Sequence, residues 1–373
     1  MMSSDELARA ASSMEFNRGI VEKDYALTWL LKSIYSSDKL SRFLLFKGGT
    51  CLSKVYFPET WRLSEDLDFT LTESSLQPDK LKEDIEEQFK VAEDTGGPEF
   101  WFDEFHTNPG RIKAEVKFRG PLQQTSLIKV DIAREEAVVY GSEEHLITPK
   151  YSDLKPFKVT CYAIQELLVE KLRAIMQRGY TRDYFDVWKL LSLPYNSLRF
   201  NDLSHVRTAL KEKCDKSKVS YEPELIFNAK RLAEAQSEWE KSLSRVINEP
   251  PSFKKVIGDL SEKLAAEKAL STLEYAPSER VIRELIYAAS GDGLDIMRRA
   301  IDLLKKHLES SNVHTVEVAL DCLNYFSTQF IVTTGWAPAT IRRIAEPTIR
   351  SLMTKPDETI RLKSDQLLKL INR

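Results

Sequence analysis

Two neighbouring segments decide the fold of the chain: residues 43–50, FLLFKGGT, and residues 62–69, RLSEDLDF. The first is a short apolar run that ends at two glycines, which predicts a strand, a glycine turn and a short helix over residues 51–55. The second contains two aspartates within a segment that predicts another strand, over residues 66–72. Together they predict a strand, turn, helix and strand in succession, with polar chemistry at the turn and on the second strand.

The two aspartates of the second segment form a candidate metal site. Residues two apart on a strand face the same side, so Asp66 and Asp68 share one face and Leu67 faces the other. Two carboxylates this close repel each other unless a cation lies between them. Mg²⁺ binds one or two carboxylates together with substrate phosphates, so it suits this pair. Taken alone, an Asp-x-Asp motif more often marks an exposed strand end.

The glycine turn is a candidate phosphate site. Backbone N–H groups at a turn that opens a helix can hold a triphosphate. Gly48 and Gly49, which follow Lys47, would let a phosphate approach closely, and Thr50 could add a hydroxyl donor. A pair of glycines is a weak signal by itself. In this order, with the aspartates in a Ser-x-Asp-x-Asp context that starts at Ser64, the two motifs indicate a nucleotidyl-transfer site.

Asp131 is a candidate third carboxylate. Residues 126–133 alternate between polar and apolar side chains, which predicts a half-buried strand. A neighbouring strand would bring Asp131 beside Asp66 and Asp68, as two-metal phosphoryl-transfer sites require. The alternative is an outward-facing pair of Lys129 and Asp131 on the solvent side of a sheet, and the pattern favours neither.

A lysine lies on the apolar face of a helix that we predict over residues 162–178. Lys171 shares a stripe with Leu168 and Ile175, so it either snorkels to the edge of the stripe or points into a cleft. Near a bound triphosphate, its charge would offset the charge that develops at the transferring phosphorus.

Two acidic residues follow on a second predicted helix, over residues 182–193. Asp183 and Asp186 flank its apolar stripe, and either is a candidate acidic residue of the site. The plain alternatives are a favourable position in the first helical turn for Asp183 and a surface ion pair with Arg182 for Asp186.

Composition excludes several classes of protein. The 373 residues include 17 Phe, 13 Tyr and 6 Trp, which is ample material for a core and argues against disorder. No apolar run reaches the ~18 residues of a membrane span, and the polar first residues predict no secretory signal. Four cysteines without a CxxC pair indicate reduced thiols, so we expect a cytoplasmic protein rather than a disulfide framework or a zinc site.

The formal charge of −3 is distributed unevenly along the chain. Residues 73–104 are strongly acidic, and we expect them to form a solvated helix and loop. Residues 150–189 carry a basic excess with interleaved tyrosines, which makes them a candidate RNA surface, although a solvated helix face explains the same composition. Near-neutrality overall therefore does not exclude RNA.

The length predicts two or three domains. We divide the chain into residues 1–150, 151–275 and 276–373, the last being all-helical. Its successive helices of ~12 residues suit either a helical repeat, loosely HEAT-like, or a plain bundle.

Four motifs together resemble the AbiEii/AbiGii toxin family, which includes the MenT toxins. They are VEKDYALTWLL at residues 21–31, KGGTCLSK at 47–54, RLSEDLDF at 62–69, and ELLVEKLRAI with RDYFDVWKL at 166–175 and 182–190. The resemblance spans roughly residues 15–270. It implies an α+β nucleotidyltransferase-like fold, a mixed sheet with helices, followed by a helical domain that contributes to the active site.

The resemblance also implies an activity. These toxins are encoded beside an antitoxin and transfer a nucleoside monophosphate from an NTP, with Mg²⁺ and release of pyrophosphate. In MenT-like members the acceptor is the tRNA 3′ end, where added pyrimidines block aminoacylation. The family's site residues fall on Lys47, Gly48, Gly49, Thr50 and Ser64 for the nucleotide, Asp66, Asp68 and, more weakly, Asp131 for the metal, Lys171 for phosphate, and Asp183 or Asp186 for the acid.

We therefore expect a cytoplasmic Mg²⁺-dependent nucleotidyltransferase toxin that modifies RNA, tRNA above all, and blocks translation. Its expected partners are an NTP, RNA and a cognate antitoxin, without a membrane. One alternative is transfer of the nucleoside monophosphate to a protein or a small molecule. A non-enzymatic alternative is a scaffold that binds a nucleotide or a partner without turnover.

Overall fold

The structure, a computed structural model, describes residues 1–59, 62–73, 76–193, 203–288, 294–330 and 336–372. The chain divides into two compact units. The first comprises residues 1–200 and 205–253, and the second comprises residues 201–204 and 254–373.

The first unit is built on a mixed sheet. Among the described residues, seven strands follow the order β3-β4-β5-β2-β1-β7-β6. The pairs β2–β5 and β1–β7 are parallel, and the other neighbours are antiparallel. The strands are β1 (Leu44–Lys47), β2 (Asp66–Leu71), β3 (Glu99–Asn108), β4 (Arg111–Arg119), β5 (Thr125–Ala133), β6 (Ser142–Ile147) and β7 (Phe157–Tyr162).

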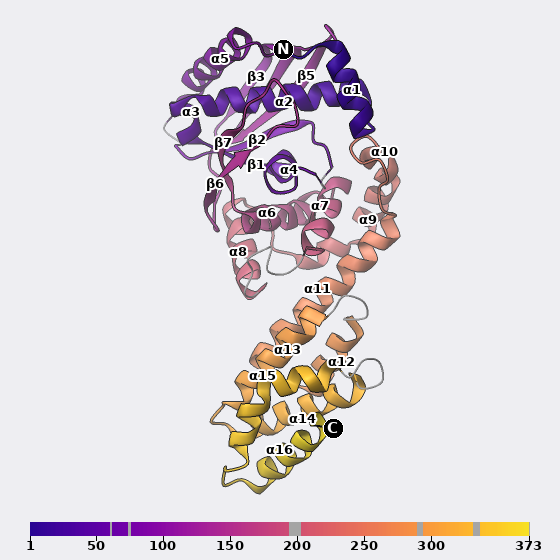
Figure 1. The fold of residues 1–373 in the computed structure, drawn as a ribbon. Helices are drawn as coiled ribbons and strands as arrows, with labels where there is room; N and C mark the ends of the chain where they lie inside the picture. Colours follow the sequence, from indigo (N-terminus) through magenta and orange to yellow (C-terminus); the bar gives the residue numbers. More distant parts are fainter. Residues whose placement is uncertain (60–61, 74–75, 194–202, 289–293, 331–335, 373) are drawn as a thin grey trace. The chain divides into compact units, whose positions relative to one another are not determined.

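Helices surround this sheet, and Figure 1 shows α2 lying across it, with α4 between the sheet and the pair α6 and α7. The helices of the first unit are α1 (Ser4–Met14), α2 (Arg18–Ser36), α3 (Asp38–Phe43), α4 (Gly48–Cys51), the π-helical turn η1 (Leu52–Tyr56), α5 (Pro78–Asp94), α6 (Ile164–Gln177), α7 (Thr181–Leu191), α8 (Leu203–Lys216), the 3₁₀ turn η3 (Pro223–Phe227), α9 (Ala229–Ser237) and α10 (Trp239–Leu243).

Helix α2 is the central element of this packing. It follows Asn17, whose side chain accepts a hydrogen bond from the backbone N–H of Gly19 and so caps the helix. Apolar residues such as Leu27, Leu30 and Leu31 are fully buried, and the helix contacts β2, β5 and β7. Burial of one face against the sheet therefore explains the stability of this helix better than propensity does.

The acidic segment differs from its prediction. We expected residues 73–104 to form a solvated helix and loop, and this is wrong in two respects. Helix α5 buries Leu81, Ile85 and Phe89, and residues 99–104 belong to strand β3. The acidic side chains lie mostly on the outer face of α5, so the charge count hid an amphipathic helix. Strands β6 and β7 were not predicted.

The second unit is helical, as predicted for the end of the chain. It contains α11 (Phe253–Tyr275), α12 (Glu279–Ala288), α13 (Leu294–Leu308), α14 (Val313–Phe330), α15 (Trp336–Leu352) and α16 (Glu358–Ile371). Helix α14 packs against α12, α13, α15 and α16. These helices share one apolar core, which includes Leu285, Ile301, Leu323, Ile341 and Leu367. The loosely HEAT-like arrangement and the division into three parts stay predictions.

Two further expectations concern cysteines and membranes. All four cysteines are free and buried, in agreement with reduced thiols. In the described part of the chain, every helix falls short of the length or apolarity that a membrane crossing requires.

Candidate active site

The glycine turn joins β1 to α4 and packs tightly against β2. Gly48 has φ +78°, a conformation that L side chains rarely adopt. A Cβ built on Gly48 would lie 2.9 Å from the Cβ of Asp68 and nearer still to its carboxylate. A Cβ on Gly49 would lie 2.5 Å from Nη2 of Arg62 and 3.3 Å from Oγ of Ser64. Glycine at both positions therefore lets Asp68, Arg62 and Ser64 reach the turn.

Thr50 ties the turn to the second strand. It is fully buried, and its hydroxyl donates a hydrogen bond to the backbone carbonyl of Asp66. The sequence suggested that this hydroxyl would be a donor to phosphate. In the structure its hydrogen is already engaged, so Thr50 fixes the distance between the turn and the aspartates.

The aspartates of β2 lie on one face, as the alternation of the sequence predicts. Leu67 and Phe69 are fully buried, whereas Asp66 and Asp68 are partly exposed. Strand β5 pairs with β2 in parallel register and places Asp131 directly opposite Asp68. The predicted neighbouring strand is thus present, and it brings the third carboxylate beside the pair.

These carboxylates influence one another electrostatically. Burial raises the pKa of Asp68 to about 6, Lys47 opposes this rise, and the negative charges of Asp131 and Asp66 add to it. Burial also raises the pKa of Asp66. Asp131 is held by an ion pair with Arg111 on β4. The site therefore has an excess of negative charge around Asp68.

This excess of negative charge suits a divalent cation whose coordination shell is completed by substrate oxygens. Within the described residues, no group of three or more His, Cys, Asp and Glu side chains is placed to hold a metal ion. Mg²⁺ does not need such a cage, because it commonly takes one or two carboxylates plus phosphate oxygens and waters. Asp66 and Asp68 offer that donor set, and a cation between them would relieve the repulsion that raises the pKa of Asp68.

Lys171 lies in a buried ion-pair cluster behind the turn. Its Nζ is 2.8 Å from Oδ2 of Asp186 and 3.3 Å from Oδ1 of Asp183, and its side chain is 10% exposed. The lysine therefore points inward rather than snorkelling to the surface. Both acidic residues that the sequence left as alternatives contact it. Arg178 pairs with Asp183 from the other side, at 2.9 Å.

Asp186 has a different partner from the one its spacing suggested. The alternative of a surface pair with Arg182 is wrong, because Arg182 pairs with Glu65 and Asp186 is fully buried. Instead Arg62 donates from Nε and Nη2 to the two carboxylate oxygens of Asp186, both at 2.8 Å. Burial alone would raise the pKa of Asp186, but Arg62 and Lys171 lower it to about 2.

Lys47, which we predicted to bind nucleotide, is enclosed by two glutamates. Its Nζ is 3.0 Å from Oε1 of Glu170 and also contacts Oε2 of Glu136. Burial opposes its charge, but the pKa of Lys47 is raised because Glu170 and Glu136 stabilise the ammonium. Burial likewise opposes ionisation of Glu170, yet Lys47 and Lys213 lower its pKa to about 2. The ion pairs of Lys47 thus fix the backbone directly before the glycine turn.

Sequence reasoning missed several residues of this region. Arg62 stood inside a quoted motif, but nothing in the motif pointed to its contact with Gly49. Glu136 and Glu170 gave no signal, because their partners are far away in the sequence. Arg178 could have been found, since an arginine at the end of α6 lies close to the first turn of α7.

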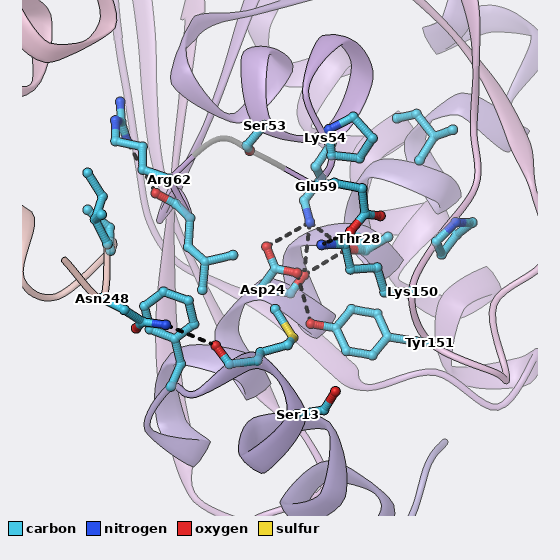
Figure 2. Close-up of a pocket in the computed structure, with 18 of the residues that line it drawn as sticks. Ser13, Asp24, Thr28, Ser53, Lys54, Glu59, Arg62, Lys150, Tyr151 and Asn248 are labelled. Carbon is cyan, nitrogen blue, oxygen red and sulfur yellow. Dashed lines mark hydrogen bonds and ion pairs between the residues drawn. The ribbon is translucent and has the colours of Figure 1, made fainter. Parts of the chain in front are cut away.

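A cavity of about 490 Å³ adjoins the site on the side of η1 and α1. Figure 2 shows Lys54 directed at Asp24 and Thr28, with Tyr151 reaching Asp24 from the opposite side. The VEKDY motif therefore supplies the wall of this cavity through Asp24. Arg62 lines it as well, and so belongs to both the cavity and the glycine turn.

A mixed sheet with a glycine turn after one strand and paired aspartates on the next defines a nucleotidyltransferase domain. The family model described as "Nucleotidyl transferase AbiEii toxin, Type IV TA system" matches residues 29–270. The chain belongs to this family of nucleotidyltransferase toxins, which confirms the resemblance found in the sequence motifs.

One of the solved structures that match the chain shares this fold. MenT4, a nucleotidyltransferase toxin from Mycobacterium tuberculosis H37Rv, matches with a TM-score of 0.52 and 17% identity over 86% of this chain and 99% of its own. A designed armadillo repeat protein matches 56% of this chain and 94% of its own, at 15% identity and a TM-score of 0.19, which supports no conclusion about the fold. No curated protein sequence matches the chain.

Proposed function

We propose that this nucleotidyltransferase toxin uses Mg²⁺ to transfer a nucleoside monophosphate from an NTP to RNA, with the tRNA 3′ end as acceptor, and so blocks translation. The observation that supports it best is the contact between the glycine turn and β2: Gly48 lies against Asp68, which lies opposite Asp131. The backbone that would bind phosphate thus lies against the carboxylates that would bind the metal, as transfer from a triphosphate requires.

In the proposed reaction, an acceptor hydroxyl oxygen forms a bond to the α-phosphorus of the NTP. The bond between that phosphorus and the oxygen bridging to the β-phosphate breaks, pyrophosphate leaves, and the hydroxyl proton passes to solvent. Mg²⁺, when bound by Asp66 and Asp68, would neutralise charge on the phosphates. The turn at Gly48 and Gly49 would hold the leaving phosphates through backbone N–H groups.

The basic residues behind the turn have a supporting role in this proposal. Arg62, Lys171 and Asp186 fix one another by buried ion pairs, and Arg62 presses against Gly49. Lys171 would reach a phosphate only by leaving Asp186 or Asp183, so its direct contact with substrate stays a prediction. Arg178 is the more accessible cation, with a side chain 46% exposed, and it is close enough to influence Asp68 electrostatically.

The proposal is tested by incubating the protein with total RNA, Mg²⁺ and each NTP labelled at the α-phosphate. We expect label in RNA, enriched in tRNA, with release of pyrophosphate that EDTA abolishes. The matched control is Asp66→Ala, which we expect to abolish transfer and relieve growth inhibition. Label that reaches no RNA with any NTP would refute the RNA acceptor, and label on lysate protein instead would favour a protein acceptor.

A further inference from the structure

The cavity beside the glycine turn is large enough for a ligand. Its volume of about 490 Å³ lies within the range of roughly 300–1,000 Å³ typical of small-molecule sites. Its wall is held rigidly, because Asp24 accepts hydrogen bonds from both Lys54 and Tyr151, each at 2.8 Å. Lys54 also donates to Thr28, at 2.8 Å. This network joins α2, η1 and the segment after β6.

The lining has an excess of positive charge. Its charged residues are four basic and two acidic: Lys54, Arg62, Lys150 and Lys189 against Asp24 and Glu59. Lys54 is neutralised by Asp24 and Arg62 by Asp186. Lys150 lies 3.4 Å from Glu59, whose side chain is 78% exposed, so this pair is weak. Lys189 has no ion-pair partner among the described residues, and burial lowers its pKa.

The same cavity is also lined by aromatic side chains, which offer a flat apolar surface. Phe16, Tyr151 and Phe185 contribute aromatic rings to its lining, and Phe16 is the most accessible of the three. Phe185 and Lys189 are four residues apart on α7, so they lie on one face of that helix. A ligand with an anionic group beside an aromatic ring would match this arrangement, and a nucleotide has both.

The position of Arg62 indicates which nucleotide this would be. Its guanidinium packs against Gly49 while the residue also lines the cavity. The glycine turn and the aspartates already account for the triphosphate of the donor. In-line displacement needs the attacking hydroxyl on the side of the phosphorus opposite the leaving group, so the acceptor requires a separate place next to the turn.

We propose that this cavity binds the terminal nucleotide of the acceptor RNA, with its phosphate at Lys189 and Lys150 and its base against Phe16. This assignment rests on the proposed transfer to RNA. It predicts that the cavity recognises the end of the strand through both charge and base stacking, independently of the NTP.

Binding of the full-length protein to a 5′-fluorescein RNA dodecamer with a free 3′ hydroxyl tests the assignment by anisotropy. We expect Lys189→Glu to weaken binding by about tenfold, as expected for a lost charge-assisted contact, and exposed Lys150→Glu to act in the same direction. Affinity for an α,β-methylene NTP should stay unchanged. Lys90→Glu is the matched control, because Lys90 is an exposed lysine on α5 outside the lining.

A second probe tests the base. A dodecamer whose last nucleotide lacks its base should bind wild-type protein more weakly than the intact RNA, and Phe16→Ala should remove that difference. Unchanged RNA affinity in Lys189→Glu and Lys150→Glu, with both variants folded by circular dichroism, would overturn the assignment. So would a loss confined to the NTP analogue, which would place the donor in the cavity. In either case, continued label transfer to RNA by the wild-type protein would leave the proposed function intact.

Discussion

The carboxylate of Asp68 fills the space that a side chain at Gly48 would need. Gly48 has φ +78°, and a Cβ there would lie 2.9 Å from Cβ of Asp68. Gly48 begins α4 directly after β1, and Asp68 lies within β2, so their contact brings the glycine turn to the carboxylates. Both backbone conformation and space therefore require glycine at this position.

Replacing Gly48 by alanine tests this contact. We expect Gly48→Ala to lower the free energy of unfolding by at least about 2 kcal/mol, from left-handed strain plus steric overlap, and to abolish transfer. The control is Gly141→Ala, because Gly141 has φ +80° with open space around it. Gly141→Ala should cost only about 1 kcal/mol. Equal costs in urea titrations would show that Asp68 does not crowd the turn.

Asp68→Asn separates chemistry from folding. The amide keeps the shape of the side chain but removes one of several repelling negative charges, so stability should be unchanged or higher. Transfer should fall by more than about a hundredfold, because metal-assisted charge stabilisation is worth several kcal/mol. Steady-state transfer and thermal unfolding measure the two effects. A stable variant that keeps full activity would remove Asp68 from the metal site.

Asp186→Asn tests the buried cluster behind the turn. Arg62 and Lys171 would lose their shared carboxylate, and breaking a buried pair costs about 3–5 kcal/mol. The matched control is Asp103→Asn, which breaks an exposed 2.7 Å pair with Lys117 and should cost less than about 1 kcal/mol. If the two substitutions cost the same in urea unfolding, the buried cluster does not stabilise the fold.

The same carboxylate predicts a pH dependence. The pKa of Asp186 is lowered to about 2 in the folded protein, below that of an unfolded aspartate, near ~3.9. A lowered carboxyl pKa contributes stability that is complete above pH ~4 and is lost as pH falls towards 2. The free energy of unfolding should therefore drop by roughly 2 kcal/mol over that window. Asp186→Asn should not show this loss of stability between roughly pH 4 and pH 2. If the unfolding free energy of the variant falls with pH as it does in the wild type, the prediction is contradicted.

Lys47→Met distinguishes an anchoring role from a phosphate-binding role. Removing the ammonium takes one cation from buried Glu136 and Glu170, although Lys213 stays close to both, so stability should fall by about 1.5–3 kcal/mol. Adding Glu170→Gln to Lys47→Met should restore part of this loss, since one buried charge disappears. A stable Lys47→Met variant with only a raised KM for NTP would instead favour direct contact with phosphate.

The sequence could predict the parts of the site that depend on local pattern. The period of two placed Asp66 and Asp68 on one face and Asp131 on the outer side of its strand, and the glycine pair marked the turn. The partner of that strand was open, because alternation does not determine which strands pair. The structure shows that β5 pairs with β2, in a register that places Asp68 opposite Asp131.

Contacts between distant segments were beyond such reasoning. Arg62 and Asp186 are separated by 124 positions, and Lys47 and Glu170 by 123. Local spacing offered Arg182 as the partner of Asp186, and only the packing of α7 behind the glycine turn replaced it with Arg62. Tertiary packing determines which buried charges pair, because burying an unpaired charge is very costly.

The ion pairs of Arg62, Lys171 and Asp186 also affect which mutations can inactivate such a toxin. Arg62 and Lys171 both pair with the fully buried Asp186, so one substitution in this interior can unfold the turn and inactivate the protein. In a genetic selection for cells that survive expression of the chain, inactivating alleles should therefore map to this interior as well as to the aspartates.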